Sequence, residues 1–121
     1  MTVPLASREL GGTGSPALVV LHGLLGSSRN WQSAGAALAA RDQRVVALDL
    51  RNHGESPWAE GCGHGEMAGD VAEWIAQSGL GPVHLLGHSL GGKVAMRLAV
   101  DRPDLVARLT VVDIAPRDYP G

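Results

Sequence analysis

The stretch Gly87-His88-Ser89-Leu90-Gly91 decides how this chain folds, because it places the pattern G-x-S-x-G between an apolar run and a helical one. The preceding residues, Val83-His84-Leu85-Leu86, predict a buried parallel strand. Residues 91–100 have helical spacing, and Pro103 ends the pattern. Strand, sharp turn and helix form the arrangement that raises a nucleophilic serine above a sheet. The strained backbone at the serine is possible only if the residues two positions before and two positions after it have no side chains. Both positions are occupied by glycine, Gly87 and Gly91.

A second motif overlaps the first. Residues 87–93 also match G-x-x-x-x-G-K, the loop that cradles phosphates in nucleotide-binding proteins. That loop continues with serine or threonine, whose hydroxyl binds magnesium, whereas this chain has Val94. An apolar side chain cannot ligate a hard cation, so the pattern favours the serine turn over a nucleotide site.

Strand-like and helix-like segments alternate along the chain, which predicts an α/β fold. The expected strands are 3–10, 17–21, 45–50, 83–86 and 109–114, and the expected helices are 30–41, 66–78 and 91–100. Residues 51–65 are rich in glycine and predict a long loop. Strands that alternate with helices are joined by right-handed crossovers, so we expect a parallel sheet. No internal repeat is visible, and the pattern predicts no second domain.

Composition and charge restrict the partners. Ten basic and twelve acidic residues give a formal net charge of −2, which offers no electrostatic basis for binding nucleic acid or an anionic membrane. No apolar run of about 18 residues is present to span a bilayer, and the N-terminus lacks the pattern of a signal or transit peptide. The single cysteine, Cys62, cannot form an internal disulfide, so we expect a cytoplasmic protein.

Three motifs in order carry a resemblance to a known family. His22-Gly23-Leu24-Leu25-Gly26-Ser27 follows one apolar run, Asp49-Leu50-Arg51-Asn52-His53-Gly54-Glu55-Ser56 follows the next, and residues 87–93 follow a third. Together they resemble the α/β-hydrolase superfamily, and residues 112–119 (VDIAPRDY) resemble the YbfF-type esterases within it. The resemblance covers residues 17–119 and matches the N-terminal half of such an enzyme. It implies that residues 1–121 are the N-terminal part of a single α/β-hydrolase domain, with the sheet truncated after the strand that follows the helix at 91–100.

Catalytic roles follow for a few residues. Ser89 is the expected nucleophile, which attacks an acyl carbon to give an acyl-enzyme. The developing oxyanion requires two N–H donors, and the backbone N–H of Leu90, at the start of the helix, is expected to be one. The resemblance implies that the N–H of Leu24 is the other. Asp113 ends the last expected strand, where some members place the triad acid, although a structural carboxylate is the favoured interpretation.

The general base is missing from this pattern. In the superfamily the order along the chain is serine, acid, histidine, yet all five histidines lie before Ser89. His88 is adjacent to Ser89, but neighbouring side chains across a sharp turn diverge, so we do not expect it to act as the base. We expect His22 to support the oxyanion loop and His84 to be packed or hydrogen-bonded within its strand.

Other polar groups have simpler interpretations. Cys62, His64, Glu66 and Asp70 lack standard zinc spacing, so we expect solvent-exposed loop rather than a metal site. The segment 51–53 either shapes the entrance to the site or pins the loop after its strand, and pinning is favoured. No cofactor is expected.

Two functional hypotheses remain. The first is a serine hydrolase acting on small-molecule acyl esters or thioesters, incomplete because this chain lacks the catalytic histidine. The second is a non-catalytic binding or interaction module on the same scaffold. In either case an apolar edge strand at 109–114 predicts self-association or pairing with a C-terminal half.

Overall fold

A computed structural model describes residues 2–23, 26–39, 43–61 and 63–112. Its elements, in chain order, are β1 (Ser7–Gly11), β2 (Gly14–Leu21), the 3-10 turn η1 (Ser28–Trp31), α1 (Gln32–Ala39), β3 (Gln43–Leu48), α2 (His64–Ser78), β4 (Val83–His88), α3 (Leu90–Asp101), the 3-10 turn η2 (Pro103–Leu105) and β5 (Val106–Val112). The predicted alternation of strands and helices is present, with boundaries shifted by a few residues. The last two residues of the predicted strand 109–114 lie outside the described residues.

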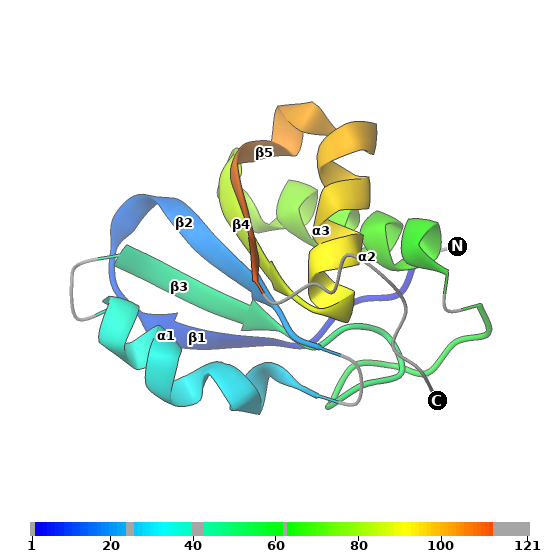
Figure 1. The fold of residues 1–121 in the computed structure, drawn as a ribbon, viewed down its shortest axis with the longest axis horizontal. Helices are drawn as coiled ribbons and strands as arrows, with labels where there is room; N and C mark the ends of the chain where they lie inside the picture. Colours follow the sequence, from blue (N-terminus) through cyan, green and yellow to red (C-terminus); the bar gives the residue numbers. More distant parts are fainter. Residues whose placement is uncertain (1, 24–25, 40–42, 62, 113–121) are drawn as a thin grey trace.

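The five strands form one sheet in the order β1-β3-β2-β4-β5 (Figure 1). The strands β3, β2, β4 and β5 are parallel, as predicted, whereas β1 runs antiparallel to β3. Only residues 12–13 separate β1 from β2, so the chain has to reverse there. Gly12 has a φ of +83°, and a Cβ at this position would clash with the backbone of Gln43. The antiparallel first strand therefore follows from a tight glycine turn that hydrophobic periodicity does not reveal.

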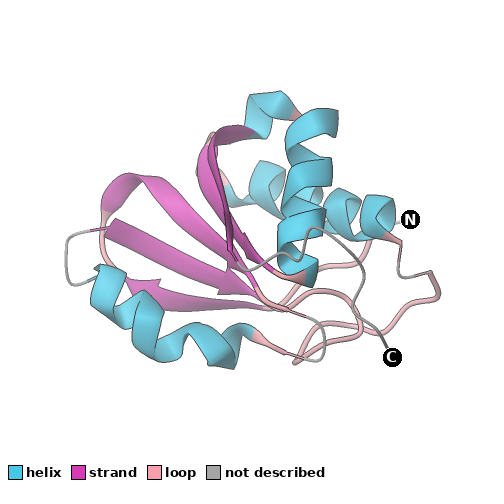
Figure 2. Ribbon diagram, in the orientation of Figure 1, coloured by secondary structure: helices cyan, strands magenta, loops and turns pink. Residues whose placement is uncertain are grey.

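Helices cover both faces of the sheet, with α2 and α3 on one side and α1 on the other (Figure 2). The apolar runs of β2 and β3 are buried on both faces, which is why their sequences are continuous rather than alternating. Successive residues of these strands belong to two separate clusters, as the period of two requires. The cluster under α2 and α3 includes Val19, Leu21, Val46 and Leu48, and the cluster under α1 includes Leu18, Val20, Val45 and Ala47.

The helices α2 and α3 pack through apolar residues at helical spacing. In α2 the fully buried positions include Met67, Val71 and Ile75, which recur every four residues and share one face of the helix. Gly79 ends the helix at a φ of +73°, the left-handed conformation expected of a glycine C-cap. No helix in the described part of the chain has both the length and the apolar character needed to cross a membrane.

Candidate active site

The turn between β4 and α3 has an unusual backbone. Ser89 has φ +56° and ψ −114°, one of two non-glycine residues with positive φ in the described chain. A Cβ at Gly87 would clash with the carbonyl of Gly91, and a Cβ at Gly91 would clash with the carbonyl oxygens of Leu21 and His22. The two glycines are therefore needed for the chain to make this turn. The strand–turn–helix order predicted from the sequence is present, and the chemical role of Ser89 stays a prediction.

Hydrogen bonds of the main chain hold Ser89 in place. Its N–H donates to the carbonyl of Val112 at 3.2 Å, and its own carbonyl accepts from Gly92 at 2.9 Å and Lys93 at 3.2 Å. Its side chain makes no capping hydrogen bond to α3, and the residue is partly exposed. Because α3 begins at Leu90, the N–H of that residue belongs to the first helical turn, whose donors have no acceptor within the helix. The helix dipole also favours negative charge at this end.

The loop after β2 passes beside the serine. A Cβ at Gly23 would lie 3.1 Å from Nδ1 of His88, closer than an ordinary contact, and 3.5 Å from Cβ of Ser89, so a side chain here would press on the ring of His88. The carbonyl of Gly23 accepts two hydrogen bonds, from the N–H of Gly26 at 3.0 Å and from Nδ1 of His22 at 2.7 Å. The orientation of this carbonyl is therefore fixed from both sides. Leu24 and Asp113, two of the predicted site residues, lie outside the described residues.

His22 is a structural imidazole. It is 1% exposed, and its Nε2 accepts from the N–H of Leu50 at 3.0 Å while its Nδ1 donates to Gly23. Both ring nitrogens are thus occupied, which sets the tautomer. Burial lowers the pKa of His22 below its usual value, although the hydrogen bond to Gly23 opposes this effect. This geometry favours the predicted supporting role, because the ring has no free nitrogen with which to accept a proton.

Asp49 ties the loop after β3 to the loop after β2. Its Oδ1 accepts from the N–H of Ser28 at 2.6 Å, and its Oδ2 accepts from the N–H of Glu55 at 3.0 Å. Burial alone would raise the pKa of Asp49, but these backbone hydrogen bonds outweigh it and hold the pKa below its usual value. Gly54, at φ +52°, lies so close to the carboxylate that a Cβ would overlap it. The sequence motifs did not identify this role of Asp49.

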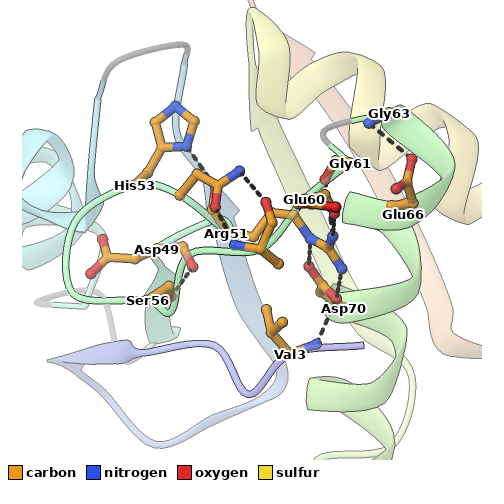
Figure 3. A network of polar contacts seen from close by, with 12 residues as sticks. Val3, Asp49, Arg51, His53, Ser56, Glu60, Gly61, Gly63, Glu66 and Asp70 are labelled. Carbon is orange, nitrogen blue, oxygen red and sulfur yellow. Dashed lines mark hydrogen bonds and ion pairs between the residues drawn. The ribbon is translucent and has the colours of Figure 1, made fainter. Parts of the chain in front are cut away.

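An internal ion pair fixes the rest of the loop after β3 (Figure 3). Arg51 donates from Nε to Oδ2 of Asp70 at 2.6 Å and from Nη2 to Oδ1 at 2.8 Å, and both side chains are almost fully buried. The third nitrogen of Arg51 donates to the carbonyls of Glu60 at 3.2 Å and Gly61 at 2.9 Å. The Asn52 side chain binds both the N–H and the carbonyl of Ala59. These contacts favour the pinning interpretation of residues 51 and 52.

The prediction of a solvent-exposed loop for His64, Glu66 and Asp70 is right about the exposure of His64 and Glu66 but wrong about the loop and about Asp70. All three belong to α2, and Asp70 is 1% exposed because it binds Arg51 and the N–H of Val3. Glu66 instead accepts from the N–H of Gly63 at the start of the helix. Within the described ranges, no group of three potential ligands is placed to hold a metal ion. Cys62 lies outside those ranges.

The remaining histidines differ in their surroundings. His84 and Thr110 form a hydrogen bond of 2.8 Å between β4 and β5, and burial, together with the charge of Arg108, lowers the pKa of His84. The ring of His88 meets Trp31 edge-on, with centroids 6.2 Å apart. His53 donates from Nδ1 to the carbonyl of Arg51 at 2.9 Å, and its ring lies 5.0 Å from that of His22.

Comparison with known proteins agrees with this geometry. A family model described as the alpha/beta hydrolase fold matches residues 16–120. The chain belongs to this family. The predicted resemblance to the α/β-hydrolase superfamily is thereby confirmed, and its narrower placement among the YbfF-type esterases stays a prediction.

Several individual proteins are similar to this chain in sequence over part of their own length. The chain is 47% identical over 116 residues to a mouse (Mus musculus) protein named sn-1-specific diacylglycerol lipase ABHD11, covering 94% of this chain and 38% of the relative. It is 38% identical over 104 residues to Ethanol acetyltransferase 1 of Kluyveromyces lactis, covering 85% and 28%. A solved structure named Marine microorganism esterase superposes with a TM-score of 0.90 at 40% identity, covering 99% of this chain and 45% of that one. The chain thus spans less than half the length of these proteins.

Proposed function

We propose that these residues form the nucleophile part of a serine hydrolase site, which cleaves small-molecule carboxylic esters or thioesters. The observation that carries this proposal is the backbone of Ser89, held at φ +56° by two glycines that tolerate no Cβ. A fold keeps a residue in so rare a conformation only where its neighbours over-determine it, and such residues cluster at functional sites. Membership of a family that contains esterases and lipases agrees with this assignment.

The chemistry proceeds in two steps. Ser89 Oγ attacks the acyl carbon and gives up its proton to a base, and the backbone N–H groups of Leu90 and Leu24 stabilise the oxyanion. The bond to the leaving group then breaks, and the base returns the proton to the departing alcohol or thiol. Water attacks the acyl-enzyme in the same way and releases the acid. We assign Ser89 as nucleophile and keep Asp113 as a candidate acid, with a structural role as the alternative.

We further propose that the base is a histidine from outside residues 1–121. His22 already uses both ring nitrogens, and His84 is hydrogen-bonded in the sheet. Loss of the histidine in a serine triad lowers kcat on the order of 10⁶-fold, so we expect residues 1–121 alone to hydrolyse esters feebly. A non-catalytic binding module on this scaffold is the alternative, favoured by the same lack of a base. The single cysteine supports a cytoplasmic location.

Covalent labelling distinguishes the two functions. We expect a fluorophosphonate probe to modify Ser89, as shown by mass spectrometry of the labelled peptide, alone or with the C-terminal part of a related esterase supplied in trans. Ser89→Ala should remove the label, and Ser33→Ala, an exposed serine of α1, should leave it unchanged. Absence of label on Ser89 under both conditions refutes the hydrolase assignment. Because one relative is named an acetyltransferase, turnover assays should include ethanol as a competing acyl acceptor.

A further inference from the structure

Gly23 packs against two consecutive side chains of the turn after β4. It is not among the glycines with positive φ, so its backbone conformation alone would accept a side chain. A Cβ on Gly23 would lie 3.1 Å from Nδ1 of His88 and 3.5 Å from Cβ of Ser89. The missing side chain therefore lets the loop after β2 approach the imidazole of His88 and the serine at the same point.

The ring of His88 also meets Trp31. The two ring centroids are 6.2 Å apart and the ring planes are inclined by 68°, the edge-to-face arrangement that aromatic pairs prefer. The period of two in β4 places His88 on the same face of the strand as Leu86, and both Leu86 and Trp31 pack against the apolar cluster under α1. One imidazole thus contacts both the loop after β2 and the end of η1.

Trp31 is itself held in place, through its ring and through its backbone. Its ring packs on the cluster under α1, and its backbone ends the short turn η1. At the start of η1 the N–H of Ser28 donates to Asp49 at 2.6 Å, and the N–H of Ser27 donates to the side chain of Asn30 at 2.8 Å. The indole is therefore a fixed support for the ring of His88.

We propose that His88, supported by Trp31, is a positioning residue that sets the distance between the loop at Gly23 and Ser89. The inference rests on the proposed function, in which this loop supplies an oxyanion donor. Hydrogen bonds from Gly26 and His22 fix the direction of the Gly23 carbonyl, and a trans peptide carries its N–H on the opposite side. Contact with the His88 ring adds a limit on how closely the loop approaches the serine. An oxyanion donor acts only at about 2.7–3.1 Å from the oxygen, so this distance matters.

The two proposed oxyanion donors give the test an internal reference. The N–H of Leu90 belongs to α3, whereas the N–H of Leu24 belongs to the loop that His88 positions. When Oγ of Ser89 displaces fluoride from a fluorophosphonate, the phosphonyl oxygen takes the place of the oxyanion. In the ¹⁵N-labelled adduct, recorded under whichever labelling condition gives reaction in the parent chain, we expect the amide proton resonances of Leu24 and Leu90 both to move downfield.

Removal of the ring should affect one donor only. In the His88→Ala adduct the resonance of Leu90 should still move, whereas that of Leu24 should lose most of its shift. Loss of a whole oxyanion donor slows catalysis on the order of 10²–10³-fold, so a displaced donor should slow the labelling of Ser89 by about tenfold. His88→Phe keeps a ring against Trp31 and should restore both the shift and the rate, which separates packing from proton transfer.

Two more variants complete the set. Trp31→Ala removes the support of the His88 ring and should reproduce the effect of His88→Ala. His84→Ala removes an imidazole four positions earlier on the same face of β4, where it is hydrogen-bonded to Thr110, and should change neither the shift nor the rate. Urea unfolding checks that each variant folds, and Trp31→Ala replaces His88→Ala in the test if the latter does not.

Three results overturn the role of His88 and leave the proposed function intact. These are an undiminished Leu24 shift in the labelled His88→Ala chain, failure of His88→Phe to restore it, and an equal loss in His84→Ala. Absence of label on Ser89 in the parent chain instead removes the hydrolase assignment, and the inference with it.

Discussion

The strain at Ser89 can be measured by replacing this residue with glycine. A non-glycine residue in a sparsely populated region of φ and ψ costs about 1–3 kcal/mol, and Ser89, at φ +56° and ψ −114°, is such a residue. Glycine relieves this cost but loses about 0.5–1 kcal/mol through the greater freedom of the unfolded chain. We therefore expect Ser89→Gly to raise the free energy of unfolding by about 1 kcal/mol, within a range of about 0–2.5 kcal/mol.

Two controls isolate the backbone effect from the loss of the hydroxyl. Ser89→Ala also removes the hydroxyl, which makes no capping hydrogen bond, but it retains a Cβ and hence the strain. Its free energy of unfolding should stay within about 0.5 kcal/mol of that of the parent chain. Ala36→Gly, at an exposed position in α1 with ordinary helical geometry, should instead lose about 1 kcal/mol.

Urea unfolding followed by circular dichroism measures all four chains. With a slope of about 1–3 kcal/mol per molar urea, the gain expected for Ser89→Gly moves the midpoint upwards by a few tenths of a molar or more. Neither Ser89 variant should react with fluorophosphonate. The glycine variant should therefore be more stable than the parent chain and yet lack the nucleophile. A glycine variant no more stable than the alanine variant would refute the strain argument.

Three other perturbations test the surroundings of the site. Asp70→Asn leaves the buried guanidinium of Arg51 without its counter-ion and should lower the free energy of unfolding, measured in urea, by about 3–5 kcal/mol. Glu9→Gln breaks the half-exposed pair with Arg44 and should lower it by less than about 1 kcal/mol. Similar losses in the two variants would contradict the argument that burial makes the Arg51–Asp70 pair important. Because burial lowers the pKa of His22 below 6.5 in the folded chain, the unfolded chain binds more protons below that pH. The free energy of unfolding should therefore fall below pH 6.5, by up to about 1.4 kcal/mol per unit for this group, and His22→Gln should lose part of this slope; an unchanged slope would exclude His22 as its source. Finally, β5 is one of the two edge strands of the described sheet, and Leu109 and Val112 on it are exposed, so we expect residues 1–121 to self-associate. A sedimentation coefficient independent of concentration, with the value of a monomer, would contradict this.

The parts of the structure that depend on local sequence could be predicted. The turn at Ser89 requires glycines two positions before and two positions after it, and both are visible in the five consecutive residues 87–91. The strands β2 and β3 contain continuous apolar runs, the pattern typical of strands buried on both faces. Both features follow from sterics and burial within one element, so the sequence alone specifies them.

The polar network under the loops could not be predicted in the same way. Arg51 pairs with Asp70, 19 positions along the chain, and the N–H of Val3 reaches the same carboxylate across 67 positions. No periodicity connects residues so far apart, and although the helix predicted at 66–78 includes Asp70, this side chain was expected to be exposed. One signal was present, since an arginine that directly follows a buried strand needs a counter-ion if it is itself buried. The choice of partner depends on how α2 packs, which only the structure shows.

The order of the strands explains why these distant contacts converge on the site. The strands β3, β2 and β4 are neighbours and parallel, so the loops that follow them leave the sheet at the same edge. The loop after β2 is bonded to the loop after β3 through His22 and Leu50, and it lies against the elbow after β4 through Gly23. A buried ion pair that fixes the β3 loop therefore also limits the movement of the β2 loop beside the serine. Preorganised donors stabilise an oxyanion only if they do not have to move during the reaction, so loosening a contact far from Ser89 should weaken the site without touching it.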